Sequence, residues 1–252
     1  MRILLSGLGG HMGHEVAVLL AAKPRGMELA CGVDRSAGER MPVPCAKTFA
    51  EAEGPDFAAD LVIDFSHRSQ TDDLLAYVTA KGLPLILATT GQTDEERAKV
   101  AEAAKTVPIF FAANYSVGVA LLIKLAKQTA AVMKDAEIEI VEMHHDRKVD
   151  APSGTALAIG RALQEVRPEA TLALGRSGMG KRTKEEIGIH AIRMGNIVGT
   201  HEVIVGTNNQ TITLKHEAHS RALFAEGALA AAEFLIGKPA GLYDMNALLA
   251  MD

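Results

Sequence analysis

The first half of the sequence alternates short apolar segments with segments of helical period, and this alternation limits the possible folds more than any other feature. The apolar segments, which we predict to be strands, are 3–6, 29–33, 61–65, 85–88 and 107–112. The predicted helices that follow them are 11–22, 69–80, 94–104 and 119–133. Near-continuous apolar strands separated by helices are typical of a parallel sheet covered on both faces. We therefore expect a doubly wound α/β domain, which binds ligands beyond the carboxyl ends of its strands.

After about residue 133 the hydrophobic pattern changes to a period of two. Isoleucines at 138 and 140 alternate with glutamates, and Ile212 and Leu214 alternate with threonine and lysine. This pattern predicts antiparallel strands with one solvated face. The Gly-, Lys- and Arg-rich segment 175–186 is a predicted loop, and 222–236 is a predicted closing helix that ends before Gly237. The second region is therefore expected to be an α+β domain.

Charge and cysteine content exclude several classes of protein. The net charge of −5 argues against a nucleic-acid-binding surface, which needs a basic field. Two cysteines are too few for a disulfide framework or a four-cysteine zinc site, so we expect a cytoplasmic protein. The apolar run at residues 1–7 is too short for a secretory signal, and we expect no membrane span.

A glycine-rich loop follows the first predicted strand. Gly7, Gly10 and Gly13 have the spacing G-x-x-G-x-x-G, while Met12 occupies the last glycine position of the G-x-G-x-x-G pattern. A loop without Cβ atoms allows a pyrophosphate to approach the backbone at a helix N-terminus. A tight turn between strand and helix is the alternative explanation.

The end of the second predicted strand supports a dinucleotide site. Asp34 follows the loop by about 20 residues, where an acidic group accepts hydrogen bonds from the adenosine ribose. Arg35 comes next and is suited to a 2′-phosphate, so NADH and NADPH both remain open as cofactors. The alternative is that Asp34 is only a turn residue.

The segment 142–157 contains a second group of candidate residues. Ser153 is a suitable N-cap for the next helix, and Gly154 and Thr155 would offer free backbone N–H groups to an anion. Just before them, two histidines (residues 144 and 145) and Lys148 are suited to hold a second carboxylate or to deliver a proton.

Each of these residues also has a simpler explanation. Ser153 caps a helix whether or not an anion binds, and an isolated lysine is usually a solvated surface residue. Neighbouring histidines are often loop residues, and imidazole also binds zinc. Vicinal histidines seldom reach one ion, however, and no cysteine lies nearby in the sequence, so we expect no metal.

Together these segments resemble the dihydrodipicolinate reductase family over essentially the whole chain. The segments that carry the resemblance are Gly7–Gly13, Asp64–Ser66, Thr89–Gly91, Ala112–Gly118, Glu142–Leu157, Arg221 and Gly241–Met245. Of these, Glu142–Leu157 matches the family signature and is the most specific, whereas a glycine loop alone is not.

The resemblance implies a Rossmann-type dinucleotide-binding domain formed by residues 1–115 and 222–252. It implies that residues 116–221 form an α+β domain, with a mixed or antiparallel sheet, that binds substrate and builds a homotetramer. The implied activity is the reduction of 4-hydroxy-tetrahydrodipicolinate by NADH or NADPH, on the diaminopimelate route to lysine.

The resemblance also assigns roles to individual residues. His144 corresponds to the family's proton donor and acceptor, and Lys148 to a proton donor, whereas His145, Gly154 and Thr155 correspond to substrate contacts. The positions that match nucleotide contacts are Gly7, Leu8, Gly9, Gly10, His11, Met12, Asp34, Ala88, Thr89, Thr90, Ala112, Ala113, Asn114 and Tyr115.

Three positions depart from the family pattern: His11 replaces a common arginine, Asp34 a common glutamate and Tyr115 a frequent phenylalanine. Without that arginine the resemblance does not indicate a strong preference for NADPH, because histidine is largely neutral near pH 7.

The substrate carries two carboxylates, which suggests a specific use of the second group of residues. We expect one carboxylate to bind at Ser153, Gly154 and Thr155, and the other to bind His145 and Lys148. Either His144 or Lys148 then supplies the proton. The rival hypotheses are another Rossmann reductase of amino-acid metabolism, which needs only the glycine loop, and a redox-sensing protein that binds the nucleotide without turnover.

Overall fold

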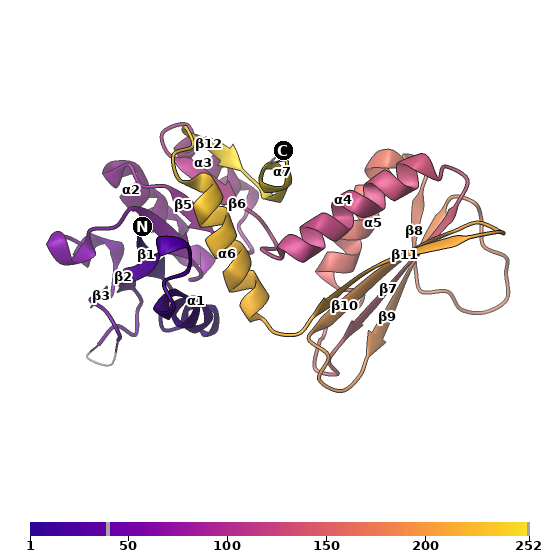
Figure 1. The fold of residues 1–252 in the computed structure, drawn as a ribbon, viewed down its shortest axis with the longest axis horizontal. Coiled ribbons are helices and arrows are strands. Elements are labelled where there is room, and N and C mark those ends of the chain that lie inside the picture. The colour runs from indigo at the N-terminus through magenta and orange to yellow at the C-terminus, as the bar shows by residue number, and fades with distance from the viewer. Residues whose placement is uncertain (39–40, 251–252) are drawn as a thin grey trace. The chain divides into compact units, whose positions relative to one another are not determined.

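The structure is a computed structural model that describes residues 1–38 and 41–250 (Figure 1). The chain divides into two compact units: Met1–Ser116 together with the segment from Arg221 onward, and Val117–Ser220. Residues 251 and 252, the end of the predicted nucleotide-binding domain, lie outside the described residues.

The first unit contains a seven-stranded sheet in which every pair of neighbouring strands is parallel. In spatial order the strands are β12 (Gly241–Tyr243), β6 (Pro108–Phe111), β5 (Leu85–Leu87), β4 (Leu61–Asp64), β1 (Arg2–Ser6), β2 (Glu28–Val33) and β3 (Cys45–Ala46). The chain runs outward from β1 in both directions, so the sheet has a topological switch point beside this strand. The doubly wound Rossmann-type fold expected from the alternating pattern is confirmed.

Helices cover both faces of this sheet. On one face, α2 (Thr71–Lys81) and α3 (Asp94–Ala103) bury Leu74 and Val100 against strand residues such as Val62. On the other face, α1 (His11–Ala21) and α6 (Ala222–Leu235) pack against each other and the strands, and α7 (Met245–Leu249) follows. Because both faces are covered, the strands are apolar at nearly every position.

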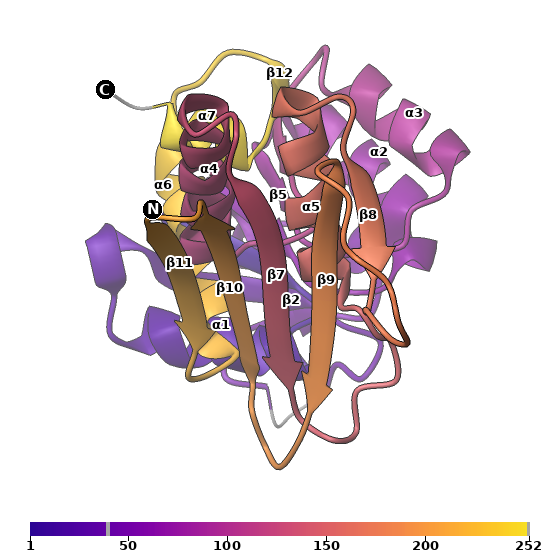
Figure 2. The same ribbon diagram turned by 90° about the vertical axis from the view of Figure 1, so that its right-hand side faces the viewer.

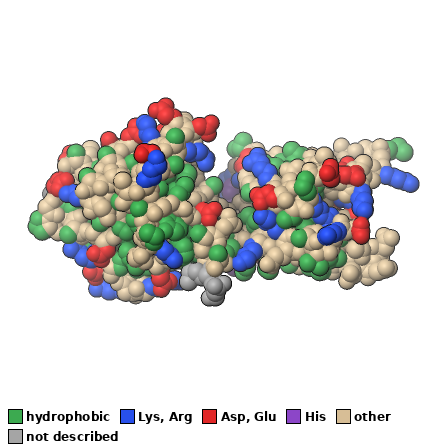
Figure 3. Space-filling model, turned by 90° about the horizontal axis from the view of Figure 1, so that it is seen from above, with side chains coloured by type: hydrophobic (Ala, Val, Ile, Leu, Met, Phe, Trp, Pro, Cys, Tyr) green, Lys and Arg blue, Asp and Glu red, His purple; other side chains and the backbone are tan. Residues whose placement is uncertain are grey.

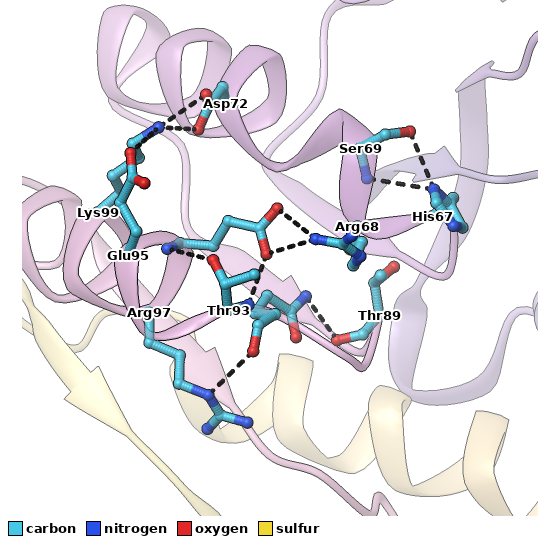
Figure 4. A network of polar contacts seen from close by, with 11 residues as sticks. His67, Arg68, Ser69, Asp72, Thr89, Thr93, Glu95, Arg97 and Lys99 are labelled. Atoms are coloured by element: carbon cyan, nitrogen blue, oxygen red, sulfur yellow. Dashed lines mark hydrogen bonds and ion pairs between the residues drawn. The ribbon is translucent and has the colours of Figure 1, made fainter.

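Polar contacts fix the turns that follow β4 and β5 (Figure 4). Thr93 and Glu96 form a capping box that begins α3, and Arg68 donates to both oxygens of Glu96 at 3.2 and 3.3 Å. The side-chain amide of Gln92 donates to the Thr89 carbonyl at 2.9 Å. The segments that follow β4 and β5 are thereby both held at the start of α3.

The second unit is a five-stranded sheet with two helices, α4 (Val117–Val132) and α5 (Gly154–Val166), on one face. In spatial order its strands are β11 (Thr211–Ala218), β10 (Gly199–Gly206), β7 (Glu137–His144), β9 (Glu186–Arg193) and β8 (Thr171–Leu174). In Figure 2 the sheet lies in front of α4 and α5. Side chains from the helices and from the inner face of the sheet, Ile140, Ile159 and Val203 among them, form its core.

The pairing in this sheet is mixed rather than wholly antiparallel. β10 pairs antiparallel with β7 and β11, but β9 pairs parallel with β7 and with β8. The mixed or antiparallel sheet expected for this region is therefore confirmed, and the two strands predicted from alternation, β7 and β11, both pair antiparallel with β10. Alternation of apolar and polar residues shows only that one face of a strand is buried and the other is not. It does so for β7, but it does not indicate whether the neighbouring strand is parallel or antiparallel.

Charged side chains of both signs are interspersed over the face drawn in Figure 3. Within residues 1–38 and 41–250, every helix is too short or too polar to cross a membrane.

Candidate active site

The glycine loop connects β1 to α1 and brings its backbone very close to neighbouring chain. Gly7 has φ +82°, and a Cβ there would lie 2.6 Å from the Phe65 carbonyl oxygen. A Cβ on Gly13 would lie 2.0 Å from the Gly7 carbonyl oxygen. Gly10 is the N-cap of α1, and no side-chain hydrogen bond caps the helix. The first turn of α1 therefore presents backbone N–H groups of the kind that bind a pyrophosphate.

Asp34, directly after β2, is tied to this loop. Its carboxylate accepts the Gly9 N–H at 2.8 Å, the Ser36 N–H at 2.8 Å and the Ser36 hydroxyl at 2.5 Å. Burial acts to raise the pKa of Asp34, but these hydrogen bonds outweigh it and the pKa is lowered. An ionised acceptor therefore stands beside the glycine loop, as a ribose hydroxyl would require.

A pocket of about 280 Å³ joins these elements. It is lined by Ser6, Gly7, Gly9, Gly10, Val33, Asp34, Arg35, Lys47, Phe65, Ser66, His67 and Gln70. Arg35 and Lys47 give it two cationic side chains, and Lys47 was not among the sequence candidates. Of the other loop candidates, His11 is exposed, Met12 half-buried and Leu8 buried.

The other nucleotide candidates follow β5 and β6. Thr89 is buried and its hydroxyl donates to Asp64 at 2.6 Å, whereas Thr90 is exposed. The Tyr115 hydroxyl donates to the Leu87 and Phe110 carbonyls, each at 3.0 Å, so this side chain is held inside the sheet. Of the rest, Ala88 is buried, Ala112 and Asn114 are half-buried, and Ala113 is exposed.

In the second unit, β7 places Glu142 and His144 on its buried face. The side chain of Glu142 is 0% exposed, and its Oε2 lies 2.6 Å from His144 Nδ1. The His144 ring packs edge-on against His201 of β10, with 5.2 Å between ring centroids. A Cβ at Gly199 would lie 3.1 Å from His144 Nε2, so a glycine there leaves room for the ring.

Four donors surround the Glu142 carboxylate. Arg193 of β9 donates to Oε2 at 2.8 Å and to Oε1 at 2.7 Å, and the Ser153 N–H donates to Oε1 at 2.9 Å. His144 Nδ1 is the fourth. Burial alone would raise the pKa of Glu142, but the hydrogen bonds from Arg193, His144 and Ser153 lower it. Glu142 is therefore ionised, and Nδ1 of His144 must be the donor in their shared bond.

Ser153 begins α5 and is engaged on both sides. It is 2% exposed, its hydroxyl accepts the Ala156 N–H at 3.1 Å, and His201 Nε2 lies 3.1 Å from the same oxygen. Burial and the neighbouring His144 lower the pKa of His201 to about 4, so this ring is neutral near pH 7. His201 Nδ1 has no hydrogen-bond partner among the described residues.

Lys148 and Asp150 lie in the loop between β7 and α5. Lys148 Nζ is 2.8 Å from Asp150 Oδ1, and the Asp150 carboxylate also accepts the Gly154 N–H. The Lys148 ammonium, with the smaller contribution of this N–H, lowers the pKa of Asp150. A Cβ on Gly154 would have no neighbour within 4 Å, and Thr155 is half-buried. An internal carboxylate therefore lies at the helix start where a substrate carboxylate was expected.

Sequence reasoning missed Glu142, Arg193, His201 and Asp150. Glu142 could have been found, because it continues the buried register of Ile138 and Ile140 on a strand of period two. Arg193 and His201 come from strands far along the sequence, and only the pairing of those strands with β7 brings them here.

Across residues 1–38 and 41–250, His, Cys, Asp and Glu side chains do not form any group of three or more that could hold a metal ion.

Two family models together match almost the entire chain. Residues 1–115 match the family described as "Dihydrodipicolinate reductase, N-terminus", and residues 118–249 match "Dihydrodipicolinate reductase, C-terminus".

Curated relatives are similar over their full length. The chain is 42% identical to the 4-hydroxy-tetrahydrodipicolinate reductase of Clostridium tetani, covering 99% of this chain and 97% of the relative. It is 43% identical to the protein of the same name from Caldanaerobacter subterraneus subsp. tengcongensis, covering 99% and 98%.

Solved structures share the fold. A dipicolinate-bound dihydrodipicolinate reductase from Paenisporosarcina sp. TG-14 aligns with a TM-score of 0.82 and 25% identity, covering 98% of each chain. An aspartate dehydrogenase from Thermotoga maritima aligns with a TM-score of 0.52 and 13% identity over 95% of this chain and 98% of its own. The second likeness concerns the fold alone.

Proposed function

This chain belongs to the dihydrodipicolinate reductase family, and from that membership we propose how its own residues carry out the reaction. The protein is a nicotinamide-dependent oxidoreductase that reduces 4-hydroxy-tetrahydrodipicolinate in the diaminopimelate route to lysine. The observation that carries this function is the full-length match to relatives of this activity at about 40% identity. The roles of individual residues, the cofactor preference and the assembly are our proposals.

The first unit binds the dinucleotide. Its glycine loop accepts the pyrophosphate, because Gly7, Gly9 and Gly10 line the pocket without side chains and the first turn of α1 has no side-chain cap. Asp34 accepts a hydrogen bond from a ribose hydroxyl. Arg35 and Lys47 line the same pocket and supply positive charge for the 2′-phosphate of NADPH. We infer that the chain uses both NADH and NADPH. The nicotinamide ring, when bound, supplies the hydride.

The remaining nucleotide candidates act mainly through their backbone. Thr89 and Tyr115 have hydroxyl groups that are already bonded inside the unit. Ala88, Ala112 and Ala113 have no polar side-chain atoms. Thr90 and Asn114 lie in the segments that follow β5 and β6. These residues shape the edge of the sheet on which the nucleotide lies.

The second unit binds the two carboxylates of the substrate. One carboxylate binds at the start of α5, at Gly154 and Thr155, and the other carboxylate binds to His145 and Lys148. Ser153 contributes by beginning the helix, because its N–H and hydroxyl are already engaged with Glu142 and Ala156. Two fixed anion sites hold a small ring in one orientation, which lowers the entropic cost of the reaction.

His144 holds the proton that balances the hydride. Its Nδ1–H is committed to the ionised Glu142, so Nε2 is the ring nitrogen that gains and releases a proton. Lys148 is the alternative donor, but its ammonium is paired with Asp150 at 2.8 Å and suits carboxylate binding better. The 4-hydroxyl leaves as water before one hydride and one proton are added.

We also propose a homotetramer in the cytoplasm. The face of the second sheet opposite α4 and α5 carries half-buried or exposed apolar side chains at Val141, Met143, Ile192 and Ile204, which suits subunit contact. Cys31 and Cys45 are both free, as expected in a reducing compartment.

The test couples the purified protein to a synthase that makes the unstable substrate and follows oxidation of NADH and NADPH in separate reactions. We expect turnover with both cofactors, and none without the synthase. Nucleotide binding without turnover would instead support a redox-sensing protein and would refute the proposed function.

A further inference from the structure

Glu142 is a fully buried carboxylate whose hydrogen bonds go beyond those of a simple ion pair. It lies on the inner face of β7, where its neighbours two and four residues earlier are Ile140 and Ile138. An ionised group at such a position is costly unless hydrogen bonds replace its hydration. Each of its two oxygens accepts two hydrogen bonds, so the carboxylate is saturated.

The four donors belong to three separate parts of the substrate site. His144 is the proton-bearing side chain, and the Ser153 N–H is the start of the anion-binding helix. Arg193 also donates to the Asp150 carbonyl at 2.7 Å, which holds the loop that carries Lys148. Glu142 therefore connects the proton donor, the helix start and the lysine loop through one rigid group.

A purely structural ion pair between Glu142 and Arg193 would explain only part of this arrangement. The two Arg193 bonds use one lone pair on each oxygen, and the second lone pair on Oε2 goes to His144 at 2.6 Å. Since an ionised carboxylate only accepts hydrogen bonds, this contact places the proton on Nδ1 of the imidazole. The neutral ring then has its free lone pair at Nε2.

We propose that Glu142 is a positioning residue for reduction, which fixes the tautomer and ring orientation of His144 so that protons are exchanged only at Nε2. This inference rests on the proposed role of His144 in the reaction. It assigns no contact between Glu142 and the substrate.

The tautomer can be measured directly on the protein labelled with ¹⁵N-histidine. In wild-type protein, at a pH where the ring is neutral, we expect His144 to carry its proton on Nδ1, and in Glu142→Gln we expect the Nε2–H form to appear. His190 of β9, which bonds to Glu139 of β7 at 2.9 Å, is an internal reference that should not change. An unchanged His144 tautomer in a folded Glu142→Gln variant would overturn the proposal whether or not the enzyme turns over.

Kinetics separate positioning from structure. We expect Glu142→Gln to lower kcat by about 10²-fold with little change in KM. In a His144→Ala background the same substitution should change kcat by less than about twofold, because its target is gone. Glu165→Gln is the matched control: it removes an exposed glutamate paired with Lys127 at 2.6 Å and should leave kcat unchanged.

Glu142→Gln leaves Arg193 without its counter-charge, and this alone could prevent folding. A second variant keeps the proposal testable in that case. Glu142→Gln/Arg193→Met removes both charges, so its urea midpoint should exceed that of Glu142→Gln. Its kcat should stay low, with the Nε2–H tautomer present. Recovery of wild-type kcat in this variant, or an equal loss of kcat with and without His144, would show a structural role only. Absence of turnover in wild-type protein would refute the reaction but leave the tautomer measurement valid.

Discussion

The two units build their binding sites in opposite ways. The proposed nucleotide site of the first unit is made largely of backbone, with glycines at 7 and 13 where a Cβ would clash with neighbouring backbone. The proposed substrate site of the second unit is made of side chains that converge on one buried carboxylate, Glu142. A backbone site depends on space and strand order, so it recurs among enzymes of different specificity. A side-chain network depends on residue identity, and we propose that this one carries the substrate-specific chemistry.

This contrast predicts which substitutions matter in each unit. In the first unit, a substitution that adds side-chain volume should lower stability and nucleotide affinity strongly. A substitution that only removes a polar side chain should have a small effect on both. In the second unit, removal of a single polar atom should be harmful even where the volume is conserved.

Substitution of the proton donor should have the largest effect. We expect His144→Ala to lower kcat by about 10²–10⁴-fold with KM nearly unchanged, because general acid catalysis contributes about this factor. Lys148→Ala should mainly raise KM for the dicarboxylate. Steady-state kinetics at saturating cofactor measure both parameters. If Lys148→Ala lost kcat and His144→Ala kept it, the two roles would have to be exchanged.

Acid should destabilise the second unit through His201. The pKa of this ring is about 4 in the folded protein, against 6.5 when exposed, so the unfolded chain takes up the proton first as pH falls. The contribution of His201 to the free energy of unfolding is fully present above pH 6.5 and is lost as the pH falls towards 4. The total loss is about 3 kcal/mol at most. Urea denaturation at several pH values should show a shallower pH dependence in His201→Asn. Identical slopes in the two proteins would contradict the burial of a neutral ring.

Added volume in the glycine loop should affect nucleotide binding and stability together. A Cβ on Gly13 would lie 2.0 Å from the Gly7 carbonyl oxygen, so Gly13→Ala must displace the start of α1. We expect a loss of about 1–3 kcal/mol in the free energy of unfolding and a higher KM for NADH and NADPH alike. Gly180→Ala, with no neighbour within 4 Å, is the control. Normal nucleotide affinity in Gly13→Ala would show that the loop does not hold the pyrophosphate.

Asp150 should compete with the substrate for its anion site. Its carboxylate already accepts the Gly154 N–H and lies 2.8 Å from Lys148 Nζ. Asp150→Asn removes this charge, so we expect KM for the dicarboxylate to fall by about threefold, the size of an exposed ion-pair contribution. Inhibition by pyridine-2,6-dicarboxylate should strengthen in parallel. A higher KM would mean that Asp150 supports the site instead of competing for it.

An effect of similar size is expected on the choice between NADH and NADPH. Lys47 lines the nucleotide pocket on an exposed position, where a charge pair contributes about 1 kcal/mol or less. Lys47→Ala should therefore raise KM for NADPH by about threefold and leave KM for NADH unchanged. An equal change for both cofactors would place Lys47 away from the 2′-phosphate.

The sequence predicts the first unit better than the second, for a physical reason. Each strand and helix of a doubly wound sheet has its own local hydrophobic period, and glycine and acidic residues mark the strand ends on which the nucleotide depends. The two-residue strand β3 (Cys45–Ala46) and the edge strand β12 (Gly241–Tyr243) carry too little pattern to be predicted.

In the second unit the candidates on one continuous segment, from His144 to Thr155, could be found because they are close in sequence. Arg193 and His201 could not, since their place depends on which strands pair with β7. The parallel pairing of β7 with β9 leaves no trace in either strand alone. Residues proposed to contact the ligand are therefore easier to identify here than the residues that hold them in place.

The path of the chain has a consequence for synthesis on the ribosome. Residues 117–220 are contiguous, whereas the first unit requires α6 and β12, which are translated after the whole second unit. The buried alanines of α6, including Ala228 and Ala232, reach the sheet only at that stage. Until then the sheet face that α1 and α6 share is covered only in part, so the first unit cannot complete its fold, whereas residues 117–220 are already made and can fold.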